Sequence, residues 1–238
     1  IRKKVAVVGA GMAGLVATKQ LKEEGHEIVV FDRTDGWGGV WASSKKRGGR
    51  AWGSTLSSTG ALNTTLSDSP FPVFHAENGT APLHFSAQQF MDMLIAYEKR
   101  YDVFSGCLRT QTEVTSMALQ ENDTWCITSR SPDGNTSEET FDAVTVCTGL
   151  NHEPWTPPFE GSGTFKGQQM HVNDYDFTSP EQFSGKRVLV VGVGETSADI
   201  AKDLVDHGVG TLFVAPNRPT ITLARGFGSV PPDYNENR

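Results

Sequence analysis

The sequence contains few features that would direct the chain to a membrane, to nucleic acid or to a metal ion. Only three of its 238 residues are cysteines, Cys107, Cys126 and Cys147, and no two of them have the spacing of a metal-binding pair. We therefore expect buried free thiols, a reducing compartment and no metal site. No apolar run approaches the roughly 18 residues that a membrane helix needs. The formal net charge of −7 provides no basic field for nucleic acid.

Signals for secretion are also weak. The N-terminus leads directly into a predicted strand without a signal peptide, and it lacks an initiating Met, so we expect that a few residues have been trimmed. Asn-x-Ser/Thr sequons matter only in a secreted chain, and here they begin at Asn63, Asn78, Asn122 and Asn135. We interpret them as polar loops and expect a cytoplasmic protein. Attachment to the cytosolic face of the endoplasmic reticulum would depend on parts outside this chain.

The N-terminal residues contain a strand, a turn, a helix and a second strand in succession. Residues 5–8 and 28–31 are short apolar runs rich in β-branched residues, which is typical of buried parallel strands. Between them, apolar residues recur at helical spacing up to Gly25, a residue suited to ending the helix. This pattern predicts a βαβ unit.

The turn of this unit carries the GxGxxG pattern of dinucleotide-binding proteins. Gly9 permits the tight turn, Gly11 lets the backbone approach a pyrophosphate, and Gly14 lets helix and strand pack closely. The helix N-terminus offers free N–H groups to the phosphates. Asp32 ends the next strand, where an acid binds a ribose 2′-hydroxyl. The pattern predicts a dinucleotide site; the alternative is a tight glycine turn beside an ordinary surface Asp.

The middle of the chain mixes irregular and regular structure. Residues 33–84 are rich in Gly, Ser, Thr and Pro, and we expect them to wrap over a cofactor as irregular chain. Apolar spacing predicts a helix over 86–100 with Ser86 as its N-cap. Residues 108–147 predict a three-stranded β-meander followed by a return strand.

The βαβ plan recurs about 183 residues after its first appearance. A strand over 187–191, the turn GVGETSA, a helix ending near Gly208 and a strand over 211–214 follow one another. Gly192 and Gly194 begin a second phosphate turn. We expect a second dinucleotide site here, at the start of a second unit.

Small and polar residues complete this second turn. Ala198 is expected to take the third, closely packed position, and Thr196 and Ser197 are expected to cap the helix and reach phosphate oxygens. No acid ends the following strand, but Arg218 lies nearby, and an Arg there suits a 2′-phosphate. NADP is therefore favoured over NAD; the alternative for Arg218 is a solvated loop residue.

A family resemblance rests on these motifs and their surroundings. The segments KKVAVVGAGMAGL and VVFDRTDGWGGVW closely resemble the FAD-binding N-terminus of flavin-containing monooxygenases. In that family the GG-x-W segment, here Gly38 to Trp41, packs along the ribityl chain and pyrophosphate of the flavin. Thr148-Gly149 matches the family's second FAD contact. The alternative for Trp41 is plain core packing.

A linker fingerprint extends the resemblance to about Arg218. Phe165, Gly167, His171 and Tyr175 match the family pattern F-x-G-x-x-x-H-x-x-x-Y at every position. The related Baeyer–Villiger signature instead ends in Trp-Pro or Trp-Asp. Spacing alone gives His171 no acid–base role, and we expect it to be a structural residue of a linker and hinge.

The resemblance implies an α/β fold with two Rossmann-like dinucleotide-binding domains, the first with a β-meander and the second incomplete in this chain. The expected boundaries are 1–155 for the FAD-binding domain, 156–184 for the linker and 185–238 for the start of the NADPH-binding domain. The residues implied to bind FAD are Gly9, Ala10, Gly11, Met12, Ala13, Gly14, Asp32, Arg33, Gly39, Val40, Trp41, Val114, Thr148 and Gly149. Those implied to bind NADPH are Gly192, Gly194, Thr196, Ser197, Ala198, Asp199 and Arg218.

One position departs from the family pattern. Family members carry a Thr-Asn pair after the GG-x-W loop, and the Asn contacts flavin and nicotinamide. Aligned backward from residues 67–72 and forward from Trp52, this Asn falls on Ser58. Asn63 could serve only if the loop shifts by five residues. Ser58 is the favoured catalytic candidate and Asn63 the alternative, although a Ser has a shorter reach than an amide.

The resemblance implies an NADPH-dependent flavin monooxygenase. NADPH would reduce FAD, reduced FAD would take up O₂ as a C4a-hydroperoxide, and a nitrogen or sulfur of a small-molecule substrate would attack the distal oxygen. The alternatives are an NADPH oxidase, a Baeyer–Villiger-type flavoenzyme or a non-catalytic flavin-binding protein. No nucleic acid partner and no membrane segment are expected in this chain.

The chain is also shorter than the family pattern. A βαβ start with two or three strands cannot bury both faces of its sheet. We therefore expect a second polypeptide or a C-terminal segment to complete the fold. This expectation fails if the 238-residue chain is a stable monomer without a partner polypeptide.

Overall fold

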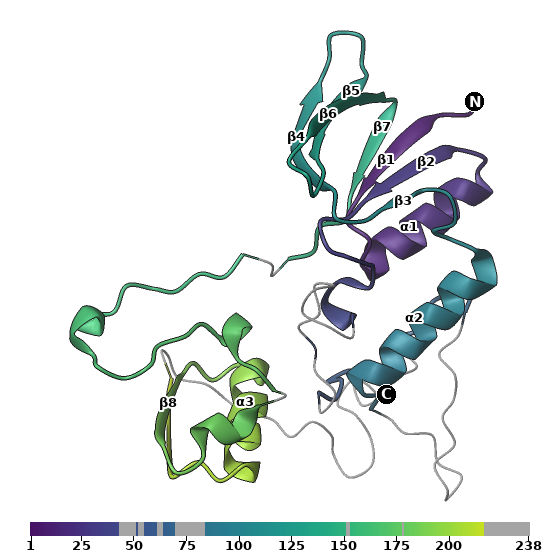
Figure 1. Cartoon of the computed structure of the whole chain (residues 1–238). Helices are drawn as coiled ribbons and strands as arrows, with labels where there is room; N and C mark the ends of the chain where they lie inside the picture. Colours follow the sequence, from purple (N-terminus) through teal and green to yellow (C-terminus); the bar gives the residue numbers. More distant parts are fainter. Residues whose placement is uncertain are drawn as a thin grey trace, which may run out of the picture. The chain divides into compact units, whose positions relative to one another are not determined.

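The computed structural model describes residues 1–42, 51, 55–60, 64–69, 84–150, 153–177 and 179–216. The chain divides into two compact units (Figure 1). The described residues of the first unit lie within Ile1–His152, and those of the second lie within Glu153–Gly228. None of the described helices is long and apolar enough to cross a membrane.

A parallel four-stranded sheet forms the centre of the first unit. Its strands are β1 (Lys4–Val8), β2 (Glu27–Phe31), β3 (Leu108–Arg109) and β7 (Ala143–Val146), in the order β3-β2-β1-β7. The apolar runs expected as buried strands are confirmed as β1 and β2, each beginning one residue earlier than expected. Because β1 lies between β2 and β7, the residues that follow its carboxyl end lie at the middle of one edge of the sheet.

Two helices cover one face of this sheet. Helix α1 (Met12–Glu23) connects β1 to β2, and Gly25, directly after its C-cap Glu24, has a φ of +81°, the conformation expected of a helix-terminating glycine. Helix α2 (Ala87–Tyr101) starts at the predicted N-cap Ser86, which forms a reciprocal capping box with Gln89. The two helices and the facing strand residues share one buried cluster, which includes Val7, Leu15, Val30, Phe90, Leu94 and Tyr97.

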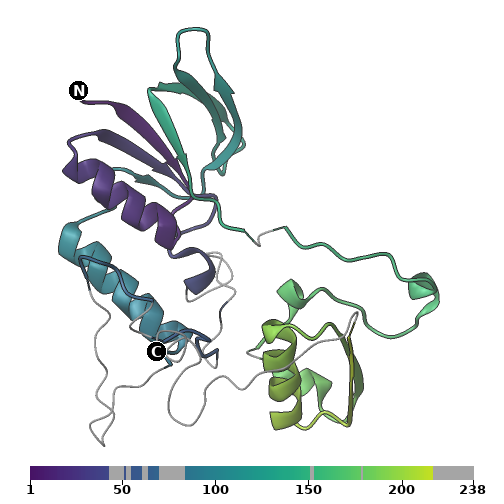
Figure 2. The ribbon, with the colours of Figure 1, turned by 180° about the vertical axis from the view of Figure 1, so that it is seen from behind.

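The predicted β-meander covers the opposite face. It consists of β4 (Glu113–Leu119), β5 (Trp125–Arg130) and β6 (Thr136–Phe141), which pair antiparallel in chain order. The rings of Phe31 and Phe141 meet edge to face with centroids 6.0 Å apart. The unit therefore has three layers, with the helices and the meander on opposite sides of the parallel sheet (Figures 1 and 2).

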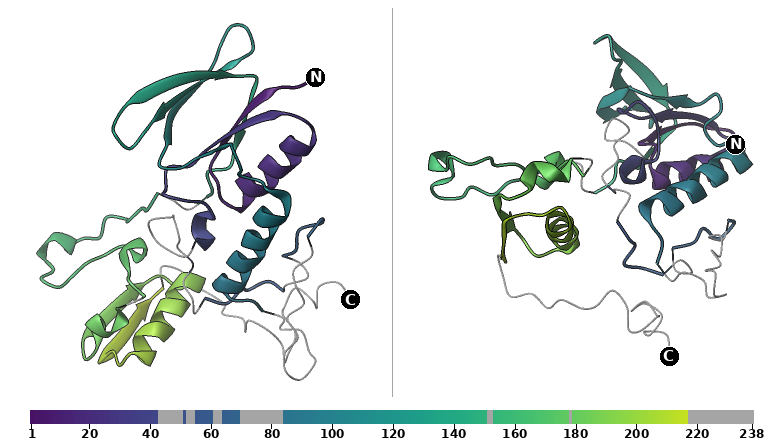
Figure 3. Two further views of the ribbon diagram at one scale, coloured as in Figure 1. Left: turned by 45° about the vertical axis from the view of Figure 1, so that its right-hand side comes forward. Right: turned by 60° about the horizontal axis from the view of Figure 1, so that its bottom comes forward.

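The second unit contains a two-stranded parallel sheet and one long helix among its described residues. Strand β8 (Arg187–Val191), helix α3 (Glu195–Asp206) and strand β9 (Thr211–Ala215) form the predicted second βαβ unit (Figure 3). The short 3₁₀ turns η3 (Ser162–Thr164), η4 (Val172–Asp174) and η5 (Pro180–Phe183) precede it. Its buried core consists of Tyr175, Phe183, Ile200 and Leu204.

The cysteines are free, but only one of the three is buried. Cys107 is buried, whereas Cys126 and Cys147 are partly exposed, so the expectation of three buried thiols is wrong for two of them. Ile127 and Ser129 of β5 are buried while Cys126 is not, because successive residues of a strand face opposite sides. Cys147 follows the last residue of β7, at the end of the sheet.

Candidate dinucleotide-binding sites

The first Gly-rich turn has room only for glycine at two positions. Gly9 has a φ of +103°, and a Cβ there would lie 2.4 Å from the carbonyl oxygen of Cys147. A Cβ on Gly14 would lie 1.9 Å from the carbonyl oxygen of Gly9. The turn is therefore pressed between the end of β7 and the first turn of α1.

The N-terminus of α1 is open toward this turn. Gly11 is the N-cap and no side chain caps the helix; the first hydrogen bond of the helix runs from the Leu15 N–H to the Gly11 carbonyl oxygen, at 2.9 Å. The N–H groups of Met12, Ala13 and Gly14 belong to the first turn, where a helix has no internal acceptors. These donors and the helix dipole suit a phosphate.

Asp32 also has a structural role, which we did not predict from the sequence. Its Oδ2 accepts a hydrogen bond from the Ala10 N–H at 2.8 Å. Its Oδ1 accepts from the N–H and the hydroxyl of Thr34, at 2.9 and 2.7 Å. The carboxylate thus connects the Gly-rich turn to the loop after β2. An Asx turn, in which a carboxylate binds the backbone two residues on, was the available signal.

The GG-x-W segment lies on the Gly-rich turn. The Gly38 N–H donates to the Ala10 carbonyl oxygen at 2.9 Å. Gly39 has a φ of +58°, and a Cβ on it would lie 3.1 Å from the Cα of Gly11. The backbones of Gly11 and Gly39 therefore face each other without a side chain between them, and a side chain on Gly39 would fill that space.

Trp41 ends the short 3₁₀ turn η1 (Gly39–Trp41) and packs into the core of the unit. Its ring lies 4.5 Å from that of Phe90, between centroids, on helix α2. Core packing, the alternative interpretation of this Trp, therefore describes at least part of its contacts. Val40, beside it, is exposed.

Three of the four remaining candidates of the first site lie at the same end of the sheet. Thr148 and Gly149 follow β7 and are exposed, and the backbone nitrogen of Thr148 would lie 3.2 Å from a Cβ on Gly9. Arg33 lines an open hollow of about 520 Å³ just beyond Asp32. Val114, near the start of β4, instead packs among the apolar residues beneath the meander.

The loop with the catalytic candidates is described in part. Ser58 is exposed, in a bend. Its neighbour Ser57 is fixed: the Ser57 hydroxyl accepts from the Phe85 N–H at 3.0 Å and donates to the Thr59 carbonyl oxygen at 2.8 Å. Asn63, the alternative candidate, lies outside the described residues.

The second turn repeats the geometry of the first. The Gly192 N–H donates to the Ala215 carbonyl oxygen at 2.9 Å, as the Gly9 N–H donates to that of Phe31 at 2.8 Å. Gly192 has a φ of +118° and Gly194 is the N-cap of α3. Arg218 lies outside the described residues, and Asp199, on α3, is partly exposed.

Two expectations for the second turn need correction. Thr196 and Ser197 do not cap the helix, because α3 begins at Glu195 and has no side-chain capping bond. Ser197, rather than Ala198, occupies the position of Gly14: the Ala198 N–H donates to Gly194 as that of Leu15 does to Gly11. The Ser197 Oγ lies 3.2 Å from the place of a Gly192 Cβ, so this turn contains a hydroxyl where the first has only backbone.

The linker fingerprint has a structural explanation at all four of its positions. The ring of Phe165 lies over Gly167, where a Cβ would be 2.5 Å from it. His171 Nδ1 accepts from the Asn173 N–H at 3.1 Å and caps η4. The buried Tyr175 hydroxyl donates to Asp203 Oδ2 at 2.8 Å, and burial, followed by this bond, raises the pKa of Tyr175. Sequence reasoning missed Asp203.

The fold and the two turns define a dinucleotide-binding protein with two Rossmann-like units. The family described as flavin-binding monooxygenase-like matches residues 2–232, and the chain belongs to it. The predicted resemblance to flavin-containing monooxygenases is thereby confirmed.

Relatives in this family differ in the reactions that their names state. A 4-hydroxybenzoate brominase (decarboxylating) of Marinomonas mediterranea is 33% identical over 86% of this chain and 37% of its own length. The N-oxide-forming dimethylaniline monooxygenase 2 of Macaca mulatta is 34% identical over 94% of this chain and 41% of its own length. The chain thus spans well under half the length of these relatives.

Solved structures agree on the fold. The S-allyl-L-cysteine S-oxygenase of Allium sativum superimposes with a TM-score of 0.78 at 25% identity, covering 93% of this chain and 53% of that one. Cyclohexanone monooxygenase of Rhodococcus sp. Phi1, bound to NADP+, gives a TM-score of 0.69 at 27% identity, covering 93% and 39%. The predicted α/β class is confirmed.

Proposed function

We propose that this chain is the FAD- and NADPH-binding part of a monooxygenase that transfers one oxygen atom from O₂ to a nitrogen or sulfur of a small molecule. The observation that carries the proposal is the cradle of backbone at the end of β1. Gly9, Gly14 and Gly39 leave little or no room for side chains, Gly11 keeps the backbone between them bare, and the N–H groups of α1 open into that space.

This cradle fits the pyrophosphate of FAD. The first-turn N–H groups of α1 would bind the phosphates, and Gly39 would let them pass close to the backbone. Asp32 retains acceptor capacity for a ribose hydroxyl, since each carboxylate oxygen accepts about two hydrogen bonds. The hollow lined by Arg33 would receive the adenosine end.

The second turn would bind NADPH in the same way, through the N-terminus of α3. The Ser197 hydroxyl would add a donor for a phosphate oxygen, and Arg218 would pair with the 2′-phosphate. The NADP+ held by the related cyclohexanone monooxygenase supports this assignment. Bound FAD supplies the redox chemistry, accepting hydride from NADPH and activating O₂.

The residues of this chain contribute binding, orientation and exclusion of water. No side-chain nucleophile is required for the proposed reaction. We assign to Ser58 the place of the family Asn beside flavin and nicotinamide, where its exposed hydroxyl could donate one hydrogen bond. We also retain 1–155, 156–184 and 185–238 as the proposed domain boundaries.

A Baeyer–Villiger reaction is the second candidate, because cyclohexanone monooxygenase shares the fold. Tyr175 argues against it: the linker fingerprint of this chain ends in Tyr where the Baeyer–Villiger signature has Trp. Ester formation from ketones would identify this reaction.

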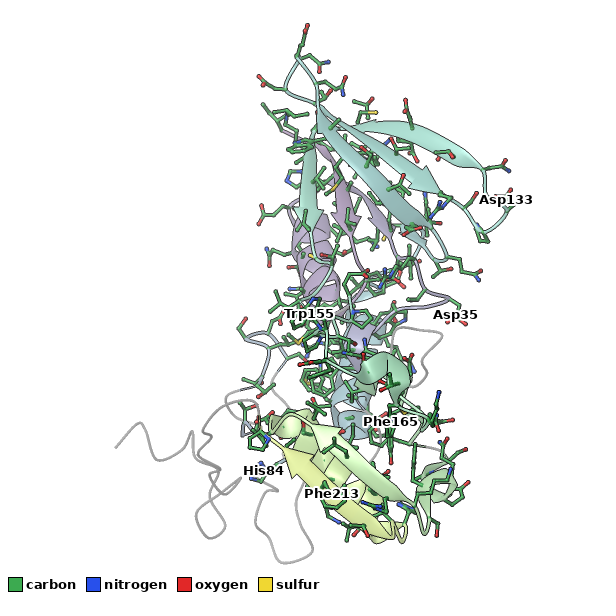
Figure 4. All side chains as sticks on the ribbon, turned by 90° about the vertical axis from the view of Figure 1, so that its left-hand side faces the viewer. Asp35, His84, Asp133, Trp155, Phe165 and Phe213 are labelled. Atoms are coloured by element: carbon green, nitrogen blue, oxygen red, sulfur yellow. The ribbon has the colours of Figure 1, made fainter. Side chains whose placement is uncertain are left out.

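We further propose that another polypeptide segment completes the second unit. On the side of the β8–β9 sheet that α3 does not cover, Leu189, Val191 and Phe213 are 59%, 52% and 48% exposed. Phe213 is labelled in Figure 4. A Rossmann-like sheet normally buries such residues beneath helices on both faces.

An anaerobic absorbance experiment on the purified protein, with all co-purifying chains, tests the function. We expect an oxidised flavin spectrum that NADPH bleaches, followed on addition of air by a long-lived intermediate spectrum and by oxygen transfer to an added amine or thioether. Immediate reoxidation with stoichiometric peroxide would favour an oxidase. Bound flavin that NADPH does not bleach would exclude the proposed enzymatic activity.

A further inference from the structure

A lysine is buried in the middle of helix α1. Lys19 has only 9% of its side chain exposed, although a charged ammonium group is costly to bury without partners. Its Nζ lies 2.6 Å from Asp68 Oδ2 and 2.7 Å from Glu23 Oε2. The same Nζ lies 4.8 Å from the centre of the Tyr101 ring, within reach of a cation–π contact.

Asp68 is the shared partner in this cluster, and it comes from the irregular segment 64–69. Besides Lys19, the Tyr97 hydroxyl donates to Asp68 Oδ2 at 3.1 Å, and the Tyr101 hydroxyl donates to the Asp68 carbonyl oxygen at 3.0 Å. The hydrogen bond from Lys19 is the main cause that lowers the pKa of Asp68. The segment is therefore fastened to both α1 and α2 by charged and hydrogen-bonded contacts.

The preceding part of the same loop is fastened at a second place. The Ser57 N–H donates to the Phe85 carbonyl oxygen at 2.8 Å, and the Ala87 N–H donates to that of Thr55 at 3.1 Å. Both bonds hold the loop against the start of α2. Between the two fastenings lies the bend that contains Ser58.

Within this span, the loop also bonds to itself. The hydroxyls of Thr59 and Thr64 lie 2.7 Å apart, and the Thr64 N–H donates to the Gly60 carbonyl oxygen at 3.2 Å. A displacement of Asp68 would therefore be transmitted through Thr64 to the bend at Ser58.

We propose that Lys19 and Asp68 are positioning residues. They hold the loop around Ser58, whose described residues are 55–60 and 64–69, in a fixed position relative to α1, the helix whose N-terminus forms the first phosphate cradle. The inference rests on the proposed function, since it gives the loop a place beside the flavin. Lys19 lies on the helix whose N-terminus forms the cradle. Its ion pair with Asp68 therefore holds the loop to the same element that would bind the pyrophosphate.

Hydrogen–deuterium exchange on the purified protein with its co-purifying chains tests the fastening without requiring activity. Asp68→Asn and Lys19→Met should speed exchange in peptides covering 55–69 by about tenfold or more, since a hydrogen bond to a charged group contributes roughly 1.5–3 kcal/mol. Lys19→Arg, which keeps the cation, should restore protection. Glu113→Gln, which removes a carboxylate from the exposed Arg130 ion pair on the meander, is the matched control and should leave these peptides unchanged.

A second readout separates positioning from stability. In Asp68→Asn, the visible circular dichroism of bound flavin should change and the peroxide released per NADPH consumed should rise, with Lys19→Arg close to the original protein. If Asp68→Asn does not fold, Tyr97→Phe provides the same comparison with a smaller perturbation.

The outcomes distinguish the inference from the function on which it rests. Unchanged exchange over 55–69 in Asp68→Asn, or an equal increase throughout the first unit, would overturn the positioning role even if flavin binds and is reduced. Local loss of protection in a protein that binds no flavin would uphold the fastening but overturn the proposed function. Local loss of protection with unchanged flavin dichroism and unchanged peroxide yield would make the fastening structural only, and would also overturn the proposal.

Discussion

Neighbouring glycines of the first turn are constrained to different degrees. A Cβ on Gly14 would collide with the backbone of Gly9, whereas a Cβ on Gly11 would have its nearest atom, the Cα of Gly39, at 3.7 Å. The fold therefore requires glycine at position 14. At position 11 the protein alone tolerates a methyl group, and the requirement comes from the ligand that the turn would approach.

This difference predicts opposite consequences for two alanine variants. Gly14→Ala should destabilise the first unit by about 1–3 kcal/mol or more, because backbone must move. Gly11→Ala should cost no more than about 1 kcal/mol but should weaken FAD binding strongly. Thermal unfolding and flavin content after desalting measure the two effects. Wild-type flavin content in Gly11→Ala would contradict the cradle assignment.

The cluster around Lys19 predicts a particular pH window. The pKa of Asp68 is lowered by Lys19, so its contribution to stability is present above about pH 4 and is lost as the pH falls further. Burial and the bond to Asp68 raise the pKa of Tyr97 to about 12, and Asp68 with Glu23 raises that of Lys19. Both contributions are full below about pH 10 and disappear as the pH rises.

The free energy of unfolding should therefore decrease between pH 10 and about 12, partly because Tyr97 ionises more readily in the unfolded chain. Tyr97→Phe should flatten this decrease. Urea unfolding of both proteins across that range checks the prediction, and parallel curves would show that Tyr97 does not contribute. Tyr175, whose pKa is also raised, stays unchanged in both proteins, so the difference isolates Tyr97.

At the scale of elements, sequence patterns predict the regular structure well where local physics decides it. The strands β1, β2 and β8 are marked by apolar runs, and α2 begins at Ser86 because its side chain and that of Gln89 satisfy free N–H groups. The meander follows from the short strand patterns of residues 108–147. Each of these signals lies within a few residues of the structure that it predicts.

Contacts between distant segments could not be predicted in this way. Asp68 lies 49 residues from Lys19, in a segment without periodicity. Asp203 binds Tyr175 from 28 residues away. The third position of the second turn was misplaced because the motif tolerates small residues at neighbouring positions, whereas the helix start at Glu195 fixes it at Ser197.

The Tyr175–Asp203 bond predicts how the linker fingerprint stabilises the second unit. Tyr175→Phe removes the hydroxyl that reaches α3 and leaves the carboxylate of Asp203 without that donor, so it should cost about 1–3 kcal/mol. Lys202→Gln, which breaks an exposed pair with Asp206 on the same helix, should change stability by less than about 0.5 kcal/mol. Denaturant unfolding of the two variants measures the contrast; equal effects would remove the special role of Tyr175.

At the scale of the whole molecule, the second unit has an apolar face without a described cover. Leu189, Val191 and Phe213 lie on neighbouring strands, and Phe213 is labelled in Figure 4. An exposed group of this kind marks a surface for further polypeptide or a risk of aggregation.

The 238-residue chain alone should therefore self-associate, and Val191→Thr with Phe213→Thr should reduce the association. Threonine is β-branched and suits a strand, so both replacements lower apolar exposure without disfavouring the strand. Light scattering during size-exclusion chromatography gives the mass. A monodisperse monomer before and after the substitutions would contradict the proposal that another segment covers this face.

The two turns share their backbone geometry, so their backbone donors alone cannot select between the two ligands. FAD and NADPH share an adenosine diphosphate half, and each turn would grip that half through the same backbone donors. Discrimination at the ribose must then come from the residue that follows the second strand, which is the carboxylate-bearing Asp32 in the first unit and the uncharged Pro216 in the second. A 2′-phosphate would meet a like charge in the first unit but not in the second, so correct loading depends on repulsion at one site as much as on attraction at the other.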